Sequence, residues 1–222
     1  MDPYKIISKE YERFLKGKNT KREVSFLSRI LKKGYVLDAG CGKGRHAIPL
    51  ALKGFKVVAV DVSESMLSAA KKYARERHAD VEFIKGDIST ISLKSNFFDN
   101  IISMYSVLSE LNEKKRLAAV RNFSKWIRPK GRVVIEVPNL EAFLNFRMEK
   151  LKQAGFYRLN LPGDFVFKIN KGCSLNVHLF SFYEVKYLFE IFGLKLAKVW
   201  GENFKRFNPR TSKNMILFFR RI

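Results

Sequence analysis

Three glycines at alternate positions, Gly40, Gly42 and Gly44, follow an acidic residue, Asp38, at the end of a short apolar run. The run is short, apolar and bounded by glycines, a pattern typical of a buried strand. A glycine loop after such a strand lets the backbone approach a ligand that a Cβ would hold away. Ligands of open α/β sheets bind beyond the carboxyl ends of the strands. We therefore expect a nucleotide-like ligand at this loop.

The spacing of these glycines distinguishes between kinds of nucleotide. The dinucleotide fingerprint requires a glycine at its sixth position, which is Arg45 here. The D-x-G-x-G-x-G arrangement instead resembles the first motif of the Rossmann-like (class I) S-adenosylmethionine (SAM) methyltransferases. SAM carries no pyrophosphate that must bind at a helix N-terminus, so a SAM-binding loop needs no glycine at the sixth position. The resemblance covers roughly residues 34 to 140. For the loop alone, a glycine-rich turn without a ligand is the alternative.

Two further acids stand at the ends of the next predicted strands. Asp61 ends the run 56–61 and lies 21 positions after Gly40, close to the spacing at which a carboxylate accepts from ribose hydroxyls. Asp87 ends the run 81–87, and the resemblance assigns it to the adenine amino group. A helix-terminal charge and an ordinary turn residue are the respective alternatives. Three signals at successive strand ends favour a SAM site.

The resemblance implies a wider set of cofactor contacts. In related enzymes an N-terminal helix closes over the cofactor, often with a tyrosine, and Tyr4 and Tyr11 are the candidates; a helix that only packs on the sheet is the alternative. The expected cofactor-binding residues are Tyr11, Asp38, Gly40, Cys41, Gly42, Arg45, Asp61, Val62, Met66, Asp87, Ile88, Ser103 and Met104.

The segment after the fourth predicted strand corresponds to the motif that the family places beside the transferred methyl group. It lacks the N/D-P-P-aromatic motif common in enzymes that methylate exocyclic amino groups of bases. Methylation of pyrimidine carbon requires a cysteine nucleophile, and Cys173 lies in no recognisable nucleophile motif. We expect in-line transfer to O, N or S, driven largely by alignment. Tyr105 and His178 are the catalytic candidates, and a structural role on a strand is the alternative for His178.

The predicted fold is α/β, and residues 1–222 are expected to form one domain. The resemblance implies a seven-stranded, mostly parallel sheet in the order 3-2-1-4-5-7-6, with an antiparallel last strand and flanking helices. Residues 139–182 depart from the family pattern. A helix over 140–154 and two alternating runs, 164–170 and 174–180, predict a helix plus β-hairpin. We expect this insertion to recognise substrate or to act as a lid.

The chain is strongly basic, with 43 Lys and Arg against 21 Asp and Glu, a formal charge of +22. Such a charge is expected of a protein that meets phosphate, although a small-molecule enzyme can also be basic. In the segment 202–213, cations are interleaved with Phe204 and Phe207, a composition that suits phosphate contact with base stacking. These features favour an RNA substrate, most plausibly tRNA. The alternatives are a small-molecule methyltransferase with the insertion as a lid, and a SAM-binding partner subunit.

Composition also limits the cellular setting. Two cysteines, Cys41 and Cys173, provide neither a disulfide framework nor a zinc-binding pattern, and we expect no metal. No run approaches the length of about 18 apolar residues needed for a membrane span, and the first residues lack an apolar signal core. A cytoplasmic enzyme without membrane partners is expected.

Overall fold

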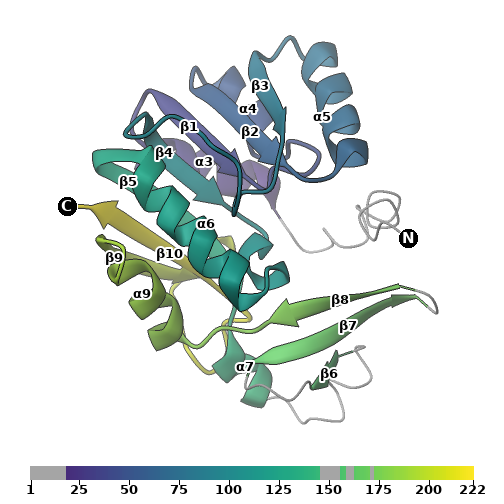
Figure 1. Cartoon of the computed structure of the whole chain (residues 1–222), viewed down its shortest axis with the longest axis vertical. Helices are drawn as coiled ribbons and strands as arrows, with labels where there is room; N and C mark the ends of the chain where they lie inside the picture. The colour runs from purple at the N-terminus through teal and green to yellow at the C-terminus, as the bar shows by residue number, and fades with distance from the viewer. Residues whose placement is uncertain (1–18, 146–155, 159–162, 171–172) are drawn as a thin grey trace.

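Seven strands form the main sheet in the computed structural model, which describes residues 19–145, 156–158, 163–170 and 173–222 (Figure 1). They are β1 (Tyr35–Ala39), β2 (Lys56–Asp61), β3 (Val81–Lys85), β4 (Phe98–Ser103), β5 (Ile127–Pro138), β9 (Leu194–Gly201) and β10 (Asn214–Arg221). The order is β3-β2-β1-β4-β5-β10-β9. Neighbours from β3 to β5 run parallel, and β10 runs antiparallel to β5 and β9. The predicted fold class is therefore confirmed.

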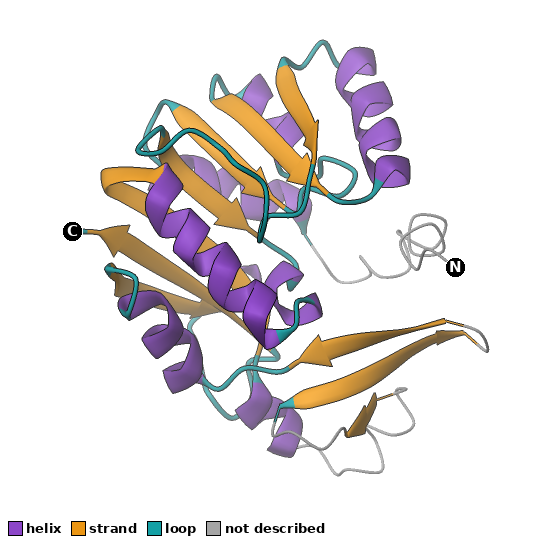
Figure 2. Ribbon diagram, in the orientation of Figure 1, coloured by secondary structure: helices purple, strands orange, loops and turns teal. Residues whose placement is uncertain are grey.

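Helices cover both faces of this sheet (Figure 2). The helical segments are α3 (Thr20–Ile30), α4 (Ala47–Leu52), α5 (Glu64–Glu76), the 3-10 turn η1 (Val107–Glu110), α6 (Glu113–Trp126), α7 (Leu140–Asn145), α9 (Phe182–Glu190) and the 3-10 turn η2 (Glu202–Phe204). Side chains of α3, α4 and α5 share one core with the sheet, and those of α6 and α9 share the other. Among the described residues, none of these helices is long and apolar enough to cross a membrane.

The central strands are apolar on both faces because each face is covered. In β4, Ile101 enters the core below α6 and α9, whereas Ile102 enters the core below α3 to α5. In β5, Val133 and Val134 alternate in the same way, and all four side chains are fully buried. Parallel strands that are covered on both faces have continuous apolar sequences. These strands could therefore be predicted from the sequence.

Polar side chains cap the first turns of two helices that flank the sheet. The Ser63 hydroxyl accepts from the Met66 N–H at the start of α5, at 3.3 Å. Ser181 begins α9 with a capping box, in which its hydroxyl accepts from the Glu184 N–H and the Glu184 carboxylate accepts from the Ser181 N–H. Both hydroxyls therefore satisfy a backbone N–H that has no partner within its helix.

A second, three-stranded antiparallel sheet lies between β5 and α9 in the sequence, formed by β6 (Phe156–Arg158), β7 (Asp164–Asn170) and β8 (Cys173–His178). The predicted hairpin is confirmed, and β6 is an additional strand. Of the predicted helix 140–154, the structure describes 140–145 as α7; the remainder lies outside the described residues. Figure 1 shows the β7–β8 hairpin extending on the side where β1, β2 and β4 end.

The connection between β9 and β10 differs from its expected role. Phe204 is 7% exposed and stacks on Phe26 of α3 with ring centroids 4.1 Å apart. Trp200 packs edge-on against both rings. Phe207 packs partly buried against the other core, 6.2 Å from the Phe182 ring. The expectation that Phe204 stacks on bases is wrong, because this ring is buried between the connection and α3.

We expect Phe204→Ala to lower the free energy of unfolding by roughly 3 kcal/mol, because it removes a buried aromatic side chain and leaves a cavity. Chemical denaturation measures this change. Tyr183→Ala is the matched control, since Tyr183 is 76% exposed and exposed substitutions usually change stability by less than about 0.5 kcal/mol. Equal effects of the two variants would contradict the assignment of Phe204 to the core.

Candidate active site

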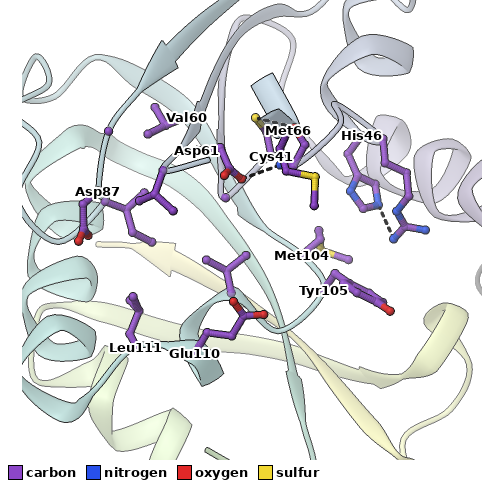
Figure 3. A pocket seen from close by; sticks show the side chains of 17 residues that line it. Cys41, His46, Val60, Asp61, Met66, Asp87, Met104, Tyr105, Glu110 and Leu111 are labelled. Atoms are coloured by element: carbon purple, nitrogen blue, oxygen red, sulfur yellow. Dashed lines mark hydrogen bonds between the residues drawn. The ribbon is translucent and has the colours of Figure 1, made fainter. Parts of the chain in front are cut away.

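One pocket opens at the carboxyl ends of β1, β2 and β4 (Figure 3). It collects residues from the glycine loop, from the ends of β2 and β3, and from the segment after β4. Its lining residues are Gly40, Cys41, Gly42, Arg45, His46, Val60, Asp61, Val62, Met66, Gly86, Asp87, Ile88, Met104, Tyr105, Val107, Glu110 and Leu111. The side chains that the sequence places at successive strand ends therefore meet in one cavity.

The end of β2 holds the glycine loop in place. The backbone N–H groups of Gly40 and Cys41 donate to the Val60 carbonyl at 2.8 and 3.0 Å. The Gly42 N–H donates to the Asp61 carboxylate at 2.8 Å. Gly40 has φ +82°, and a Cβ there would lie 2.4 Å from Val107 Cγ2. Only glycine fits both this backbone conformation and this approach.

Gly40→Ala is expected to weaken binding of S-adenosylhomocysteine (SAH) at least tenfold, because the new Cβ displaces the loop from Val107. Calorimetry measures this affinity. Gly193→Ala is the matched control: its φ is +76°, but a Cβ there meets nothing within 4 Å. The control should lose about 1–2 kcal/mol of stability through the left-handed backbone and keep its SAH affinity. Loss of affinity in both variants would mean that backbone strain alone, and not the loop position, governs binding.

Asp38 lies beneath the loop and is 1% exposed. Burial, followed by repulsion from Asp61, raises its pKa to about 7, against smaller opposing effects of the Ala47 N–H and Arg45. Its Oδ2 atom has no hydrogen-bond partner among the described residues. A buried carboxylate with one unpaired oxygen favours a cation nearby. Asp38 does not line the pocket itself, so it would act on a ligand through its charge.

Asp38 makes stability depend on pH. Its folded pKa of about 7 exceeds its ordinary value of 3.8, so the folded chain keeps a proton that the unfolded chain releases. The free energy of unfolding should therefore fall by a few kcal/mol as pH rises from about 4 to about 7. Asp38→Asn should remove this decline, as chemical denaturation at several pH values can measure. An unchanged slope in the variant would show that Asp38 is not the responsible group.

Asp87 is fixed at the rim of the pocket. Its Oδ1 atom accepts from the Ser89 N–H at 2.9 Å and the Ser89 hydroxyl at 2.6 Å, and its Oδ2 atom accepts from Lys115 at 2.8 Å. Burial raises the pKa of Asp87, but the bonds from Lys115 and Ser89 outweigh it, and the net shift is downward. The carboxylate is ionised and oriented, with Ile88 buried beside it.

Tyr105 lines the pocket from a left-handed bend (Figure 3). Tyr105 and Ser106 both have φ of +65°. The Tyr105 N–H donates to the buried Glu136 carboxylate at 3.0 Å, and the Ser106 N–H donates to the Glu136 carbonyl. Burial raises the pKa of Tyr105 to about 12, assisted by Glu136 and opposed by Arg45. Its hydroxyl is protonated at neutral pH and can donate a hydrogen bond.

The structure places His178 elsewhere. It lines a different cavity and is 8% exposed. Its Nδ1 lies 2.6 Å from Asp164 Oδ1, and its Nε2 lies 2.6 Å from Glu184 Oε1. A ring whose two nitrogens both face carboxylates has no free nitrogen to accept a substrate proton. This geometry matches the structural alternative, in which His178 ties β7 to the start of α9.

One other expected contact, Ser103, does not line the pocket. Ser103 is buried and donates from its hydroxyl to the Ala39 carbonyl at 3.0 Å, joining β4 to β1 behind the pocket wall. Tyr11, with Tyr4, lies outside the described residues.

Cys41 lines the pocket, but burial, followed by the charges of Asp38 and Asp61, raises the pKa of its thiol well above the ordinary range. It therefore stays protonated and is a poor nucleophile.

The sequence analysis missed His46 and Glu110, both of which line the pocket. His46 directly follows the glycine motif, so its ionisable side chain beside Arg45 was a detectable signal. Glu110 lies in η1, where no periodicity marks it. Among the described residues, no three His, Cys, Asp or Glu side chains are grouped as metal ligands would be.

Comparison with known proteins identifies the central part of the chain. Residues 36–131 match the family model described as a methyltransferase domain. These residues form a methyltransferase domain. The domain spans β1 to β4, α6 and the first part of β5, and it therefore contains the glycine loop, both strand-end acids and Tyr105.

Curated relatives of this methyltransferase domain include two ubiquinone biosynthesis O-methyltransferases. The one from Rickettsia akari (strain Hartford) is 30% identical over 112 residues, which cover 50% of this chain and 43% of the relative. The one from Coxiella burnetii (strain Dugway 5J108-111) is 31% identical over 109 residues, covering 49% and 45%. The chain thus spans less than half the length of these relatives.

Solved structures extend the likeness beyond the domain to almost the whole chain. An S-adenosylmethionine-dependent methyltransferase from Clostridium acetobutylicum ATCC 824 superposes with a TM-score of 0.77 at 14% identity, covering 98% of each chain. The magnesium protoporphyrin IX methyltransferase of Synechocystis PCC 6803, solved with bound SAH, gives a TM-score of 0.67 at 20% identity, covering 91% of this chain and 82% of the other. At these identities the likeness concerns the fold.

Proposed function

We propose that this protein transfers the methyl group of SAM to a small-molecule acceptor. The observation that carries the proposal is the single pocket in which the glycine loop, Asp61 and Asp87 meet at the ends of β1, β2 and β3. Figure 3 shows Asp61 between Asp87 and Cys41 of the glycine loop, which supports assigning these three elements to ribose, adenine and methionine, respectively.

The described residues suit a positively charged cofactor. Asp61 and Glu110 line the pocket, and Asp38 lies buried below the loop. The Gly40–Gly42 backbone would hold the methionine part, Asp61 the ribose, and Asp87 with Ile88 the adenine. Met104 and Tyr105 would lie near the sulfonium. Bound SAM supplies an activated methyl group, so the protein contributes mainly alignment of the acceptor.

A small acceptor is favoured over RNA for two reasons. The curated relatives carry the name ubiquinone biosynthesis O-methyltransferase, and ubiquinone is a small molecule. Phe204, which supported base stacking in the sequence analysis, is buried against α3. The RNA and tRNA prediction now depends on net charge alone, which says little about a specific partner, and no comparison supports it. The methyltransferase-domain match also favours an enzyme over a SAM-binding partner subunit.

The insertion is proposed to cover the acceptor. Its described part joins the main sheet where Asn139 pairs with Phe180, and the hairpin extends on the pocket side of the sheet (Figure 1). Arg116 of α6 contacts this junction, since its guanidinium lies 4.9 Å from the Phe180 ring. An element anchored there can close over the donor and exclude water. Residues 139–182 therefore remain, as a proposal, the lid or substrate-recognition element.

Asp61→Ala should weaken SAM binding roughly 10- to 100-fold, because it removes the acceptor of the ribose hydroxyls and the anchor of the Gly42 N–H. Calorimetry with SAM and SAH measures the change. Asp80→Ala is the control, since Asp80 is an exposed acid outside the pocket. Unchanged affinity in the Asp61 variant would contradict the placement of the ribose.

The acceptor class is tested with radiolabelled SAM and two fractions of a cell extract, one of small molecules and one of RNA. We expect the label in the small-molecule fraction, with little dependence on salt. Label that is released by RNase, with activity falling steeply as salt rises, would restore RNA as the substrate.

A further inference from the structure

His46 lies in the pocket and has no role in the site described so far. It immediately precedes α4 and is 5% exposed. It lines the cavity together with Met104 and Tyr105. Figure 3 shows its ring on the same side of the pocket as Tyr105. An ionisable ring at this depth, next to the residues expected near the methyl donor, is placed to exchange a proton with the acceptor.

A buried carboxylate orients this ring. Glu23 of α3 is 1% exposed, and its Oε2 atom lies 3.1 Å from His46 Nε2. The same oxygen lies 2.7 Å from Arg45 Nη2. A carboxylate that accepts from one imidazole nitrogen sets the tautomer and leaves the other nitrogen able to take a proton. The two residues come from different elements and are 23 positions apart, so this pairing is created by the fold.

The contacts around Nε2 select one tautomer. Arg45 Nη2 lies 3.3 Å from Nε2 but has a closer partner in Glu23, at 2.7 Å. Glu23 can only accept, so the favourable arrangement has Nε2–H donating to Glu23. In that tautomer the lone pair resides on Nδ1. Within the described part of the chain, no group is seen hydrogen-bonding to Nδ1.

We infer that His46 is the general base of the reaction and that Glu23 is its positioning residue. The substrate class is then a phenol or similar weakly acidic hydroxyl, which must lose its proton to become a good nucleophile. This inference rests on the proposed methyl transfer and specifies its acceptor.

Burial keeps the His46 ring neutral. Burial lowers the pKa of His46, and the Arg45 charge adds to this, while Glu23 of α3 and Glu136 of β5 partly oppose it; the net shift is downward. A neutral imidazole accepts a proton at pH 7, and the imidazolium that forms is stabilised by the Glu23 carboxylate. Base catalysis of this kind contributes roughly 10²- to 10⁴-fold.

The step balances without a further reactant. The acceptor O–H gives its proton to His46 Nδ1, and the oxygen lone pair forms the new O–CH₃ bond. The bond between sulfur and the methyl carbon breaks, and its electron pair stays on sulfur, so SAM becomes SAH. The imidazolium then releases its proton to water.

The state of the ring can be measured without any substrate. The chain has three histidines, so nitrogen-15 NMR of the histidine rings resolves each one, with His46→Gln and His78→Asn assigning the signals. In the SAH complex we expect a neutral His46 with Nε2–H at pH 7. A protonated ring, or a proton on Nδ1, overturns the inference and leaves the proposed methyl transfer intact.

Activity then tests the role of the base. With catechol as acceptor, His46→Gln should lose about 10²-fold or more in kcat/KM at pH 7 and keep its SAH affinity, because the Gln amide still donates to Glu23. The loss should shrink with 4-nitrocatechol, whose hydroxyl ionises more readily, and also at alkaline pH. His78→Asn is the control, since His78 is exposed. Equal losses with both acceptors, or loss of SAH binding, would assign His46 to positioning or to the cofactor carboxylate and overturn the inference.

Glu23→Gln distinguishes positioning from a purely structural role. Glu23 raises the pKa of His46, so its removal should shift the acid limb of kcat/KM to lower pH and lower the plateau. A lower plateau with an unmoved limb would show that Glu23 does not act through His46. If the wild type methylates neither catechol, the inferred substrate class fails, whereas methyl transfer itself is judged by the extract experiment.

Discussion

The active site depends on the attachment of the glycine loop to the end of β2. Two loop N–H groups donate to the Val60 carbonyl, and a third donates to the Asp61 carboxylate. Because β1 and β2 are parallel neighbours, the loop that leaves one strand lies against the end of the other. The same carboxylate that holds the loop also lines the pocket, so the group proposed to bind the ribose is oriented when the loop forms. The left-handed backbone at Gly40 is the conformational cost of this approach.

Buried charge is the second constraint on the pocket. Asp38, Glu23 and Glu136 are each about 1% exposed, and His46 is 5% exposed. The burial of each carboxylate is offset in a different way. Glu23 pairs with Arg45, and Glu136 accepts from the Tyr105 N–H and from the Asn214 amide. The pKa of Asp38 is raised, which favours its neutral form. Charges buried around a cavity and held by fixed partners act strongly on a ligand, since little water screens them. Such a pocket suits a cationic donor and a proton-accepting base.

The insertion is held to the body by a separate polar cluster. His178 links Asp164 of β7 to Glu184 of α9, and Arg116 of α6 donates to the Leu108 and Leu111 carbonyls while facing Phe180. These contacts join the hairpin to η1, whose Val107 and Glu110 line the pocket. The hairpin thus contacts an element of the pocket wall, as the proposed lid requires.

Local periodicity in the amino-acid sequence was sufficient to predict the α/β class and the β-hairpin, and the resemblance to the SAM methyltransferases implied the strand order. The rule that parallel strands bring their carboxyl ends together predicted that the glycine loop, Asp61 and Asp87 would meet at one edge of the sheet. The roles of His46, His178 and Phe204 depended on the fold. His46 acquires its role from Glu23, His178 loses its free nitrogens to Asp164 and Glu184, and Phe204 is buried by Phe26. These partners come from other elements of the chain, so no local sequence pattern encodes them. Only the tertiary structure decides whether such a side chain takes part in the reaction, joins two elements or packs in the core.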